Sequence, residues 1–216
     1  MNPSSRSFDR LAGIYRALEF LAFGRDLERT RFGLLPHLQD RRTILVLGEG
    51  DGRFLERLLT LNPTASIDCL DVSAGMLART KGRLGEKAGR VNFIHADVTT
   101  TEFSPGRYDA VVTCFLLDCF NPAQTRSLIS RVVSGLQPGA LWLWADFVLP
   151  DHGPARWRAQ IWLAGLYTFF HWQTGLRNRT LPPSEALLAG AGLVPLASVT
   201  RQWGLLRTSV YRLTAI

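Results

Sequence analysis

The stretch Thr43-Ile44-Leu45-Val46-Leu47-Gly48-Glu49-Gly50-Asp51-Gly52-Arg53-Phe54-Leu55 decides the fold of this chain. Its first five residues are apolar or β-branched, which suits a strand buried on both faces of a parallel sheet. Three alternating glycines then end the strand, and from Phe54 onward apolar residues recur at helical spacing. The pattern predicts a glycine turn at a helix N-terminus, where free N–H groups favour a ligand carboxylate or phosphate.

The remaining sequence alternates strand and helix patterns. We expect further strands at 66–70, 91–95, 108–114 and 140–148, helices at 53–61, 74–84 and 122–135, and an antiparallel hairpin from 193–200 and 205–213. Strands that alternate with helices build βαβ units and a parallel sheet. The predicted fold is therefore α/β, with a Rossmann-like, doubly wound, seven-stranded sheet that is mostly parallel and ends in the antiparallel hairpin.

Two helical segments flank or interrupt this sheet. Apolar residues at helical spacing between Phe8 and Leu35 predict one or two helices, so we assign residues 1–40 to an N-terminal helical segment and 41–216 to the core. A helical insertion at about 154–180 is rich in aromatic residues. The insertion either roofs an apolar pocket, contacts a membrane surface or a lipid, or simply packs against the core.

Composition limits the classes of partner and compartment. The chain of 216 residues has a net charge of +7, but its basic residues are spread along the sequence, which makes a nucleic-acid partner unlikely. The cysteines, Cys69, Cys114 and Cys119, lack metal-type spacing, so we expect free thiols and no metal site. With no signal peptide and no apolar run of about 20 residues, we expect a cytoplasmic protein.

Two aspartates follow strands next to the glycine turn. Asp71 ends the second strand, where a carboxylate can accept both ribose hydroxyls of an adenosine ligand. The alternative role is a cap for the helix at 74–84, which Ser73 can also supply. Asp97, with Val98 beside it, follows the third strand and is placed to accept from an adenine amino group, although aspartate is also common in ordinary loops.

In this order the motifs resemble those of the class I S-adenosylmethionine-dependent methyltransferases. The stretch Asp71-Val72-Ser73-Ala74-Gly75-Met76-Leu77 is similar to the second motif of that family, in which Met76 would lie against the adenine. The resemblance implies S-adenosylmethionine as cofactor, contacted by Gly48, Glu49, Gly50, Gly52, Asp71, Val72, Met76, Asp97, Val98 and Cys114.

One position departs from the family pattern. The family usually has an acidic residue two positions before the first glycine, and this chain has Val46 there. Either Glu49, inside the turn, takes over the electrostatic role toward the cofactor ammonium group, or the cofactor binds less tightly.

The segment Phe8-Asp9-Arg10-Leu11-Ala12-Gly13-Ile14-Tyr15 resembles the one that precedes the core in quinone C-methyltransferases and phospholipid N-methyltransferases. In those relatives the segment is a lid, so the resemblance implies that Tyr15 closes over the bound cofactor and excludes water. The alternative is that Tyr15 is a packing residue on a helix face.

The candidate catalytic residue is Asp118, which follows the fourth strand and would face the methyl group at the carboxyl edge of the sheet. It would orient or deprotonate a small apolar or aromatic acceptor, and its alternative role is a helix cap. Asp146, at the end of the fifth strand, is a second residue for the wall of the site.

Three other functions remain open. A nicotinamide-dependent oxidoreductase is disfavoured by Arg53, which stands where the dinucleotide fingerprint has its third glycine. A noncatalytic S-adenosylmethionine-binding protein is compatible with Val46 and with the lack of an unmistakable base. The hypothesis of an RNA methyltransferase rests only on the net positive charge of the chain. The sequence leaves the acceptor atom and the oligomeric state open.

Overall fold

The computed structural model describes residues 25–150, 152–154, 156–162 and 181–214. Within them one seven-stranded sheet has the order β3-β2-β1-β4-β5-β7-β6. The strands are β1 (Thr43–Leu47), β2 (Ser66–Asp71), β3 (Val91–His95), β4 (Tyr108–Cys114), β5 (Leu136–Phe147), β6 (Leu193–Arg201) and β7 (Leu206–Leu213). The first five run parallel, and β7 lies antiparallel between β5 and β6. The predicted fold class is confirmed.

The helices begin and end close to their predicted bounds. They are α2 (Asp26–Phe32), α3 (Arg53–Leu61), α4 (Ala74–Leu84), α5 (Pro122–Ser134) and α7 (Ser184–Gly190), with short 3-10 segments η1 (Leu35–Leu38), η2 (Gly85–Arg90), η3 (Leu117–Cys119) and η4 (Gln202–Gly204). Local chemistry sets these limits. Asn121 and Gln124 form a capping box at the start of α5, and Pro122 occupies its first turn, where the missing N–H costs nothing.

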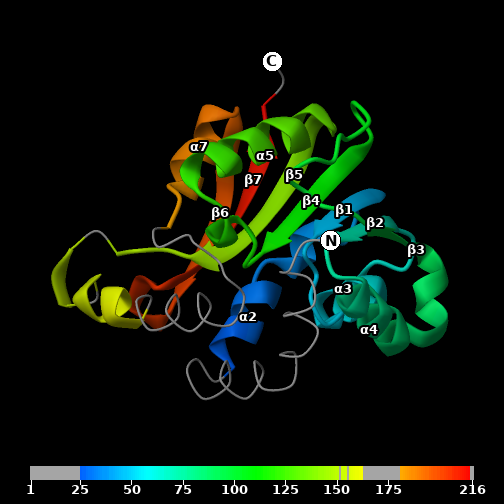
Figure 1. Cartoon of the computed structure of the whole chain (residues 1–216), viewed down its shortest axis with the longest axis horizontal. Coiled ribbons are helices and arrows are strands. Elements are labelled where there is room, and N and C mark those ends of the chain that lie inside the picture. The colour runs from blue at the N-terminus through cyan, green and yellow to red at the C-terminus, as the bar shows by residue number, and fades with distance from the viewer. Residues whose placement is uncertain (1–24, 151, 155, 163–180, 215–216) are drawn as a thin grey trace.

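The sheet separates two helical layers (Figure 1). Successive strand residues point to opposite faces, so Ile44 and Val46 join the cluster under α3 and α4, while Leu45 and Leu47 join the cluster under α5 and α7. Because both faces are covered, β1 is apolar along its whole length, as the uninterrupted run in the sequence indicated.

The strand order places a binding crevice at one edge. In the sheet, β2 and β3 lie on one side of β1, whereas β4 and β5 lie on its other side. Loops therefore diverge beyond the carboxyl ends of β1 and β4, which is where ligands bind in open α/β sheets. We call this edge of the sheet the carboxyl edge.

Two predictions about flanking segments are only partly covered. Residues 1–24 and 163–180 lie outside the described part, so the N-terminal lid, Tyr15 and most of the 154–180 insertion stay predictions; within the insertion, residues 156–162 are helical. The fifth strand begins at Leu136 and not at Ala140, because the expected turn at Pro138 is absorbed as an irregularity in the pairing of β5 with β4.

Candidate functional site

The glycine turn between β1 and α3 requires glycine at each of its three positions. Gly48, Gly50 and Gly52 have φ values of 65°, 78° and 87°, a region that residues with a side chain rarely adopt. A Cβ on Gly52 would lie 3.0 Å from the Thr80 Cα, whereas a Cβ on Gly50 would meet no heavy atom of the described residues within 4 Å. Within the described part of the chain, the turn thus packs against α4 at Gly52 and is open at Gly50.

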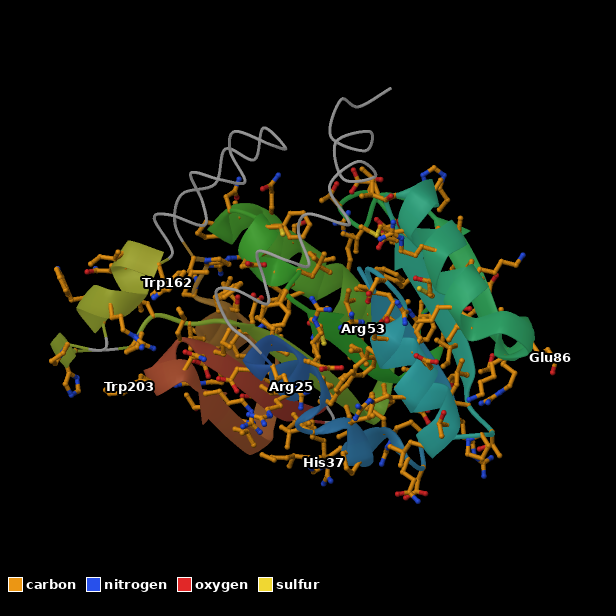
Figure 2. All side chains as sticks on the ribbon, turned by 90° about the horizontal axis from the view of Figure 1, so that it is seen from below. Arg25, His37, Arg53, Glu86, Trp162 and Trp203 are labelled. Atoms are coloured by element: carbon orange, nitrogen blue, oxygen red, sulfur yellow. The ribbon has the colours of Figure 1, made fainter. Side chains whose placement is uncertain are left out.

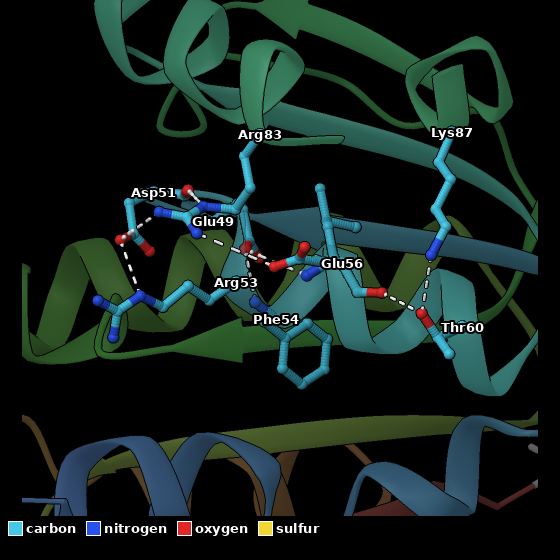
Figure 3. Close-up of polar contacts among 9 residues, drawn as sticks. Glu49, Asp51, Arg53, Phe54, Glu56, Thr60, Arg83 and Lys87 are labelled. Carbon is cyan, nitrogen blue, oxygen red and sulfur yellow. Dashed lines mark hydrogen bonds and ion pairs between the residues drawn. The ribbon is translucent and has the colours of Figure 1, made fainter. Parts of the chain in front are cut away.

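Helix α4 holds the turn in place. Thr80 donates a hydrogen bond to the Gly50 carbonyl oxygen at 3.0 Å, and the Arg83 Nε donates to the Asp51 carbonyl oxygen at 2.6 Å. Asp51 also forms an ion pair with Arg53, whose Nε lies 3.1 Å from Oδ2 (Figure 3). Arg53, which replaces the third glycine of a dinucleotide fingerprint, therefore fixes the turn in the conformation that a ligand would meet.

Glu49 points back from the turn onto the start of α3. Its Oε1 accepts hydrogen bonds from the Phe54 and Leu55 N–H groups at 3.0 and 3.2 Å (Figure 3). The side chain is buried, and burial raises the pKa of Glu49 to about 8, against the opposing effects of the two N–H groups and of Arg31. The helix N–H groups that the sequence offered to a ligand are thus taken by an acid that is protonated at neutral pH.

Asp71 lies at the end of β2, beside the glycine turn. Its Oδ1 accepts a hydrogen bond from the Ser73 N–H at 2.9 Å. Ser73 caps α4, because its Oγ accepts from the Met76 N–H at 3.1 Å. Of the two roles that the sequence left open, the capping role therefore falls to Ser73, and Asp71 stands half-buried at the carboxyl edge.

Asp97 is engaged within its own loop. Its Oδ1 accepts hydrogen bonds from the Thr99 N–H at 2.8 Å and from the Thr99 hydroxyl at 2.7 Å, the geometry of an aspartate turn. Val98 is buried in the cluster under α5. These contacts fit the ordinary loop role, and among the described residues they leave Oδ2 without a hydrogen bond.

Val72 and Met76 border the same region. The Val72 side chain is 43% exposed although it is apolar, and Met76 is half-buried in the first turn of α4. His95 fixes the Val72 backbone, since its Nε2 lies 3.0 Å from the Val72 carbonyl oxygen. An exposed valine beside Asp71 offers an apolar surface at the position where the resemblance expects an adenine.

The loop after β4 is strained. Cys114 ends the strand, and burial raises the pKa of its thiol to about 12. Phe115 has a φ of 54°, which is unusual for a residue with a side chain and is typical of functional sites. Its ring packs at 5.2 Å from the Phe147 ring, and the Arg31 guanidinium lies 5.3 Å from its centroid.

Arg31 is a residue that the sequence reasoning missed. It comes from the described end of the N-terminal segment, on α2, and its charge lowers the pKa of both Glu49 and Cys114. A helical pattern indicates which residues face inward, but not which distant element they meet. No sequence signal therefore linked Arg31 to the glycine turn.

Asp118 and Asp146 form a carboxyl pair at the same edge. Asp146 is 1% exposed, and its Oδ2 accepts from the Asp118 N–H at 3.2 Å, while Asp118 itself is partly buried. Burial and the proximity of a second acid raise the pKa of Asp146, and burial raises that of Asp118. Two neighbouring acids of this kind titrate as a pair.

Two classes of feature are not found in the described residues. No group of three or more His, Cys, Asp or Glu side chains is arranged to hold a metal ion. None of the described helices is long and apolar enough to cross a membrane.

The central region of the chain is similar to known sequences. Residues 44–139 match the family model described as a methyltransferase domain. An uncharacterized methyltransferase of Mycobacterium tuberculosis is 29% identical over 121 residues, which are 56% of this chain and 58% of the relative. A malonyl-[acyl-carrier protein] O-methyltransferase of Ilyobacter polytropus is 34% identical over 106 residues, or 48% of this chain and 39% of the relative. The chain thus spans a little over half the length of the first of these curated relatives and less than half the length of the second.

Solved structures share the whole architecture. The N-methyltransferase NodS from Bradyrhizobium japonicum, in complex with S-adenosylhomocysteine, has a TM-score of 0.68 at 16% identity and covers 99% of this chain and 100% of its own. A Burkholderia thailandensis 1,6-didemethyltoxoflavin-N1-methyltransferase, with bound 1,6-didemethyltoxoflavin and S-adenosylhomocysteine, has a TM-score of 0.67 at 18% identity and covers 98% of this chain and 88% of its own. At these identities the likeness concerns the fold. The narrower resemblance to quinone and phospholipid methyltransferases stays a prediction.

Proposed function

We propose that this chain transfers a methyl group from S-adenosylmethionine to a small apolar or aromatic acceptor, because residues 44–139 match the model of a methyltransferase domain. One arrangement carries the proposal: the positive-φ glycine turn, open at Gly50, stands beside the Asp71 carboxylate at the carboxyl edge. In this proposal the glycine turn would supply a backbone cradle for the cofactor, and Asp71 would supply a ribose acceptor.

The residues at this edge suit the chemistry of that cofactor. Asp71 would accept the two ribose hydroxyls, Val72 and Met76 would flank the adenine, and Gly50 would lie under the methionine portion. Glu49 suits the cationic end of the cofactor. A nearby sulfonium or ammonium group favours the ionised form of Glu49 and offsets the effect of burial, which raises its pKa. Arg31 would attract the carboxylate of the same ligand.

The bound cofactor supplies an electrophilic methyl group, and the chain supplies position and a proton acceptor. In-line transfer depends on holding the acceptor atom against the methyl carbon, which Phe115 and Phe147 support by forming an apolar aromatic wall. Asp118 would take a proton from an acceptor hydroxyl or amine. Asp146 would act as a positioning residue, because its carboxyl oxygen accepts a hydrogen bond from the Asp118 backbone N–H.

The relatives support a small acceptor. One structural neighbour is an N-methyltransferase crystallised with 1,6-didemethyltoxoflavin, a small molecule, and a curated relative is named for methylation of a malonyl group carried on a protein. The aromatic wall at Phe115 favours the first kind of acceptor. Contact of the 154–180 insertion with a lipid or membrane belongs to the same proposal, since it would bring an apolar acceptor to this edge.

The test separates cofactor binding from turnover. Calorimetric titration with S-adenosylmethionine, S-adenosylhomocysteine and NAD should show binding of the first two, and binding of NAD alone would refute the proposal. Asp71→Asn should weaken binding of the methyl donor at least about tenfold by removing a charged hydrogen-bond acceptor, whereas Asp40→Asn, on the exposed surface, should not.

Turnover then distinguishes an enzyme from a noncatalytic binder. Phenols, quinols, amines, lipid head groups and RNA would be screened for formation of S-adenosylhomocysteine. Asp118→Asn should lower kcat with little change in donor affinity, and Asp146→Asn should shift the pH profile of kcat. Donor binding with no turnover for any acceptor would favour the noncatalytic alternative.

A further inference from the structure

Some of the positive charge of this chain gathers in one groove of the described structure. A groove of about 510 Å³ lies between the outer side of α2, helix α3 and the end of β6. Four arginines line it: Arg25, Arg29, Arg57 and Arg201. They are far apart in the sequence, so the cluster exists only in the folded chain.

The fold directs these side chains to one place. On α2, Leu27 and Thr30 face the core, which leaves Arg25 and Arg29, four residues apart, on the outer side. Arg57 comes from the second turn of α3, and Arg201 is the last residue of β6. Figure 2 shows Arg25 at the start of α2, between the end of the hairpin that carries Trp203 and the helices that follow β1.

The charge in the groove is poorly balanced. Glu28 is the one acidic lining residue, and the Arg29 Nη1 lies 3.4 Å from the Asp26 Oδ1. Among the described residues, the other three arginines form no ion pair within 4.0 Å.

Two of the guanidinium groups are also held in position. The Arg57 guanidinium lies 4.3 Å from the centroid of the Phe32 ring, a stacking contact that reduces the cost of ordering it. The Arg201 Nε is buried and has no hydrogen-bond partner among the residues that the structure describes. Gathering like charges is unfavourable unless an anion neutralises them, and a buried N–H without a partner gains from any acceptor that enters.

We propose that this groove binds the phosphate group of a ligand, on the side of α2 opposite the methyltransferase site. Guanidinium forks match phosphate oxygens with paired hydrogen bonds, which lysine cannot do, and all the basic lining residues are arginines. Phe32 adds an apolar surface for the group that carries the phosphate. The assignment does not depend on methyl transfer, since Arg31 and Arg29 project from different sides of α2.

The test is a binding measurement that needs no enzymatic activity. Calorimetric titration of the full chain with inorganic pyrophosphate should show saturable binding that weakens as NaCl rises from about 50 to about 200 mM, because salt screens exposed charges. The double variant Arg29→Gln/Arg57→Gln should bind at least about tenfold more weakly, with Arg57→Lys in between.

The matched control is Arg126→Gln, which makes the same charge change on the exposed face of α5, across the sheet. Pyrophosphate affinity and thermal stability should both stay at the level of the unchanged chain. The proposal would be overturned if the control and the double variant bound pyrophosphate with equal affinity. It would also be overturned if the unchanged chain bound neither pyrophosphate nor anionic vesicles.

Vesicles distinguish the two sources of such a phosphate. Three results together would identify the ligand as a lipid headgroup. The protein should sediment with vesicles that contain phosphatidylglycerol but not with neutral phosphatidylcholine vesicles, and pyrophosphate should compete with the vesicles for the protein. Binding of pyrophosphate without vesicle binding indicates a soluble phosphate compound. Vesicle binding that survives the arginine substitutions but is lost in Trp203→Ser would assign the contact to that 77% exposed tryptophan and reject the groove.

Discussion

The protonation of Glu49 can be tested by its effect on folding. In the folded chain burial raises its pKa from 4.5 to about 8, whereas the unfolded chain releases the proton near 4.5. Between these values the folded state holds a proton that the unfolded state has lost, so the free energy of unfolding falls as pH rises. The stabilising effect of protonation is complete below pH 4.5 and lost as pH passes through about 8.

The size of this effect follows from linkage. Each pH unit in that interval changes the free energy of unfolding by about 1.4 kcal/mol, or about 4 kcal/mol from pH 5 to pH 8. For a chain of this size about 4 kcal/mol corresponds to a change in Tm of roughly 8–16 °C. Besides the Phe54 and Leu55 N–H groups, the ionisable groups that face Glu49 are Arg31, Asp51, Cys69 and Cys114.

The perturbation is Glu49→Gln, which keeps an oxygen for the Phe54 and Leu55 N–H groups but cannot ionise. Urea unfolding of both proteins from pH 5 to pH 9 should show the unchanged chain losing about 4 kcal/mol relative to the variant by pH 8. Glu56→Gln is the control, because it makes the same substitution nearby, on α3, at a side chain that is 49% exposed. A difference for Glu49→Gln that stays constant within about 1 kcal/mol would refute the reasoning, since Glu49 would then be ionised in the folded chain.

Three further substitutions test the architecture of the site. Gly52→Ala should lower the free energy of unfolding by about 2 kcal/mol or more, because it adds left-handed strain and a contact with the α4 backbone, as urea unfolding would show. Gly50→Ala should cost only about 1 kcal/mol in unfolding yet abolish most binding of S-adenosylhomocysteine in calorimetry, since its Cβ would enter open space where the ligand is proposed to lie. Asp109→Ala should destabilise the fold by about 1–3 kcal/mol in the same unfolding assay, because its carboxylate accepts two backbone N–H groups at the start of β1; an effect under about 0.5 kcal/mol would contradict this.

The strands and helices were predictable because each has a local signal. The apolar run at 43–47, the glycines after it and the Asn121-Pro122 start of α5 are set by rules that act within a few residues. The fifth strand was the exception. Pro138 and Gly139 indicate a turn, but pairing with β4 keeps this segment in the sheet through an irregularity.

The chemistry of the site was less predictable, because it depends on which elements meet. The sequence placed Glu49 in the glycine turn but not its hydrogen bonds to α3, and it offered Asp97 for adenine although Thr99 occupies one of its oxygens. The basic groove could not be predicted for the same reason. Arginines that are spread along the sequence argued against a polyanionic partner, yet the fold brings Arg57 and Arg201 together beside α2.

Backbone strain links the two proposed sites. Among the described residues, the non-glycine positions with positive φ are Phe115, Gln202 and Trp203. Phe115 opens the loop at the proposed methyltransferase site, and the other two directly follow Arg201 of the groove. Gln202 donates to the Asp26 Oδ2 at 2.5 Å, and Arg158, which stacks on Trp203, donates to the Gln202 carbonyl oxygen, so surrounding contacts hold this strained turn. Strain persists only where such contacts enforce it, and it gathers at binding sites. That it occurs beside both sites supports a functional role for the arginine groove as well as for the glycine turn.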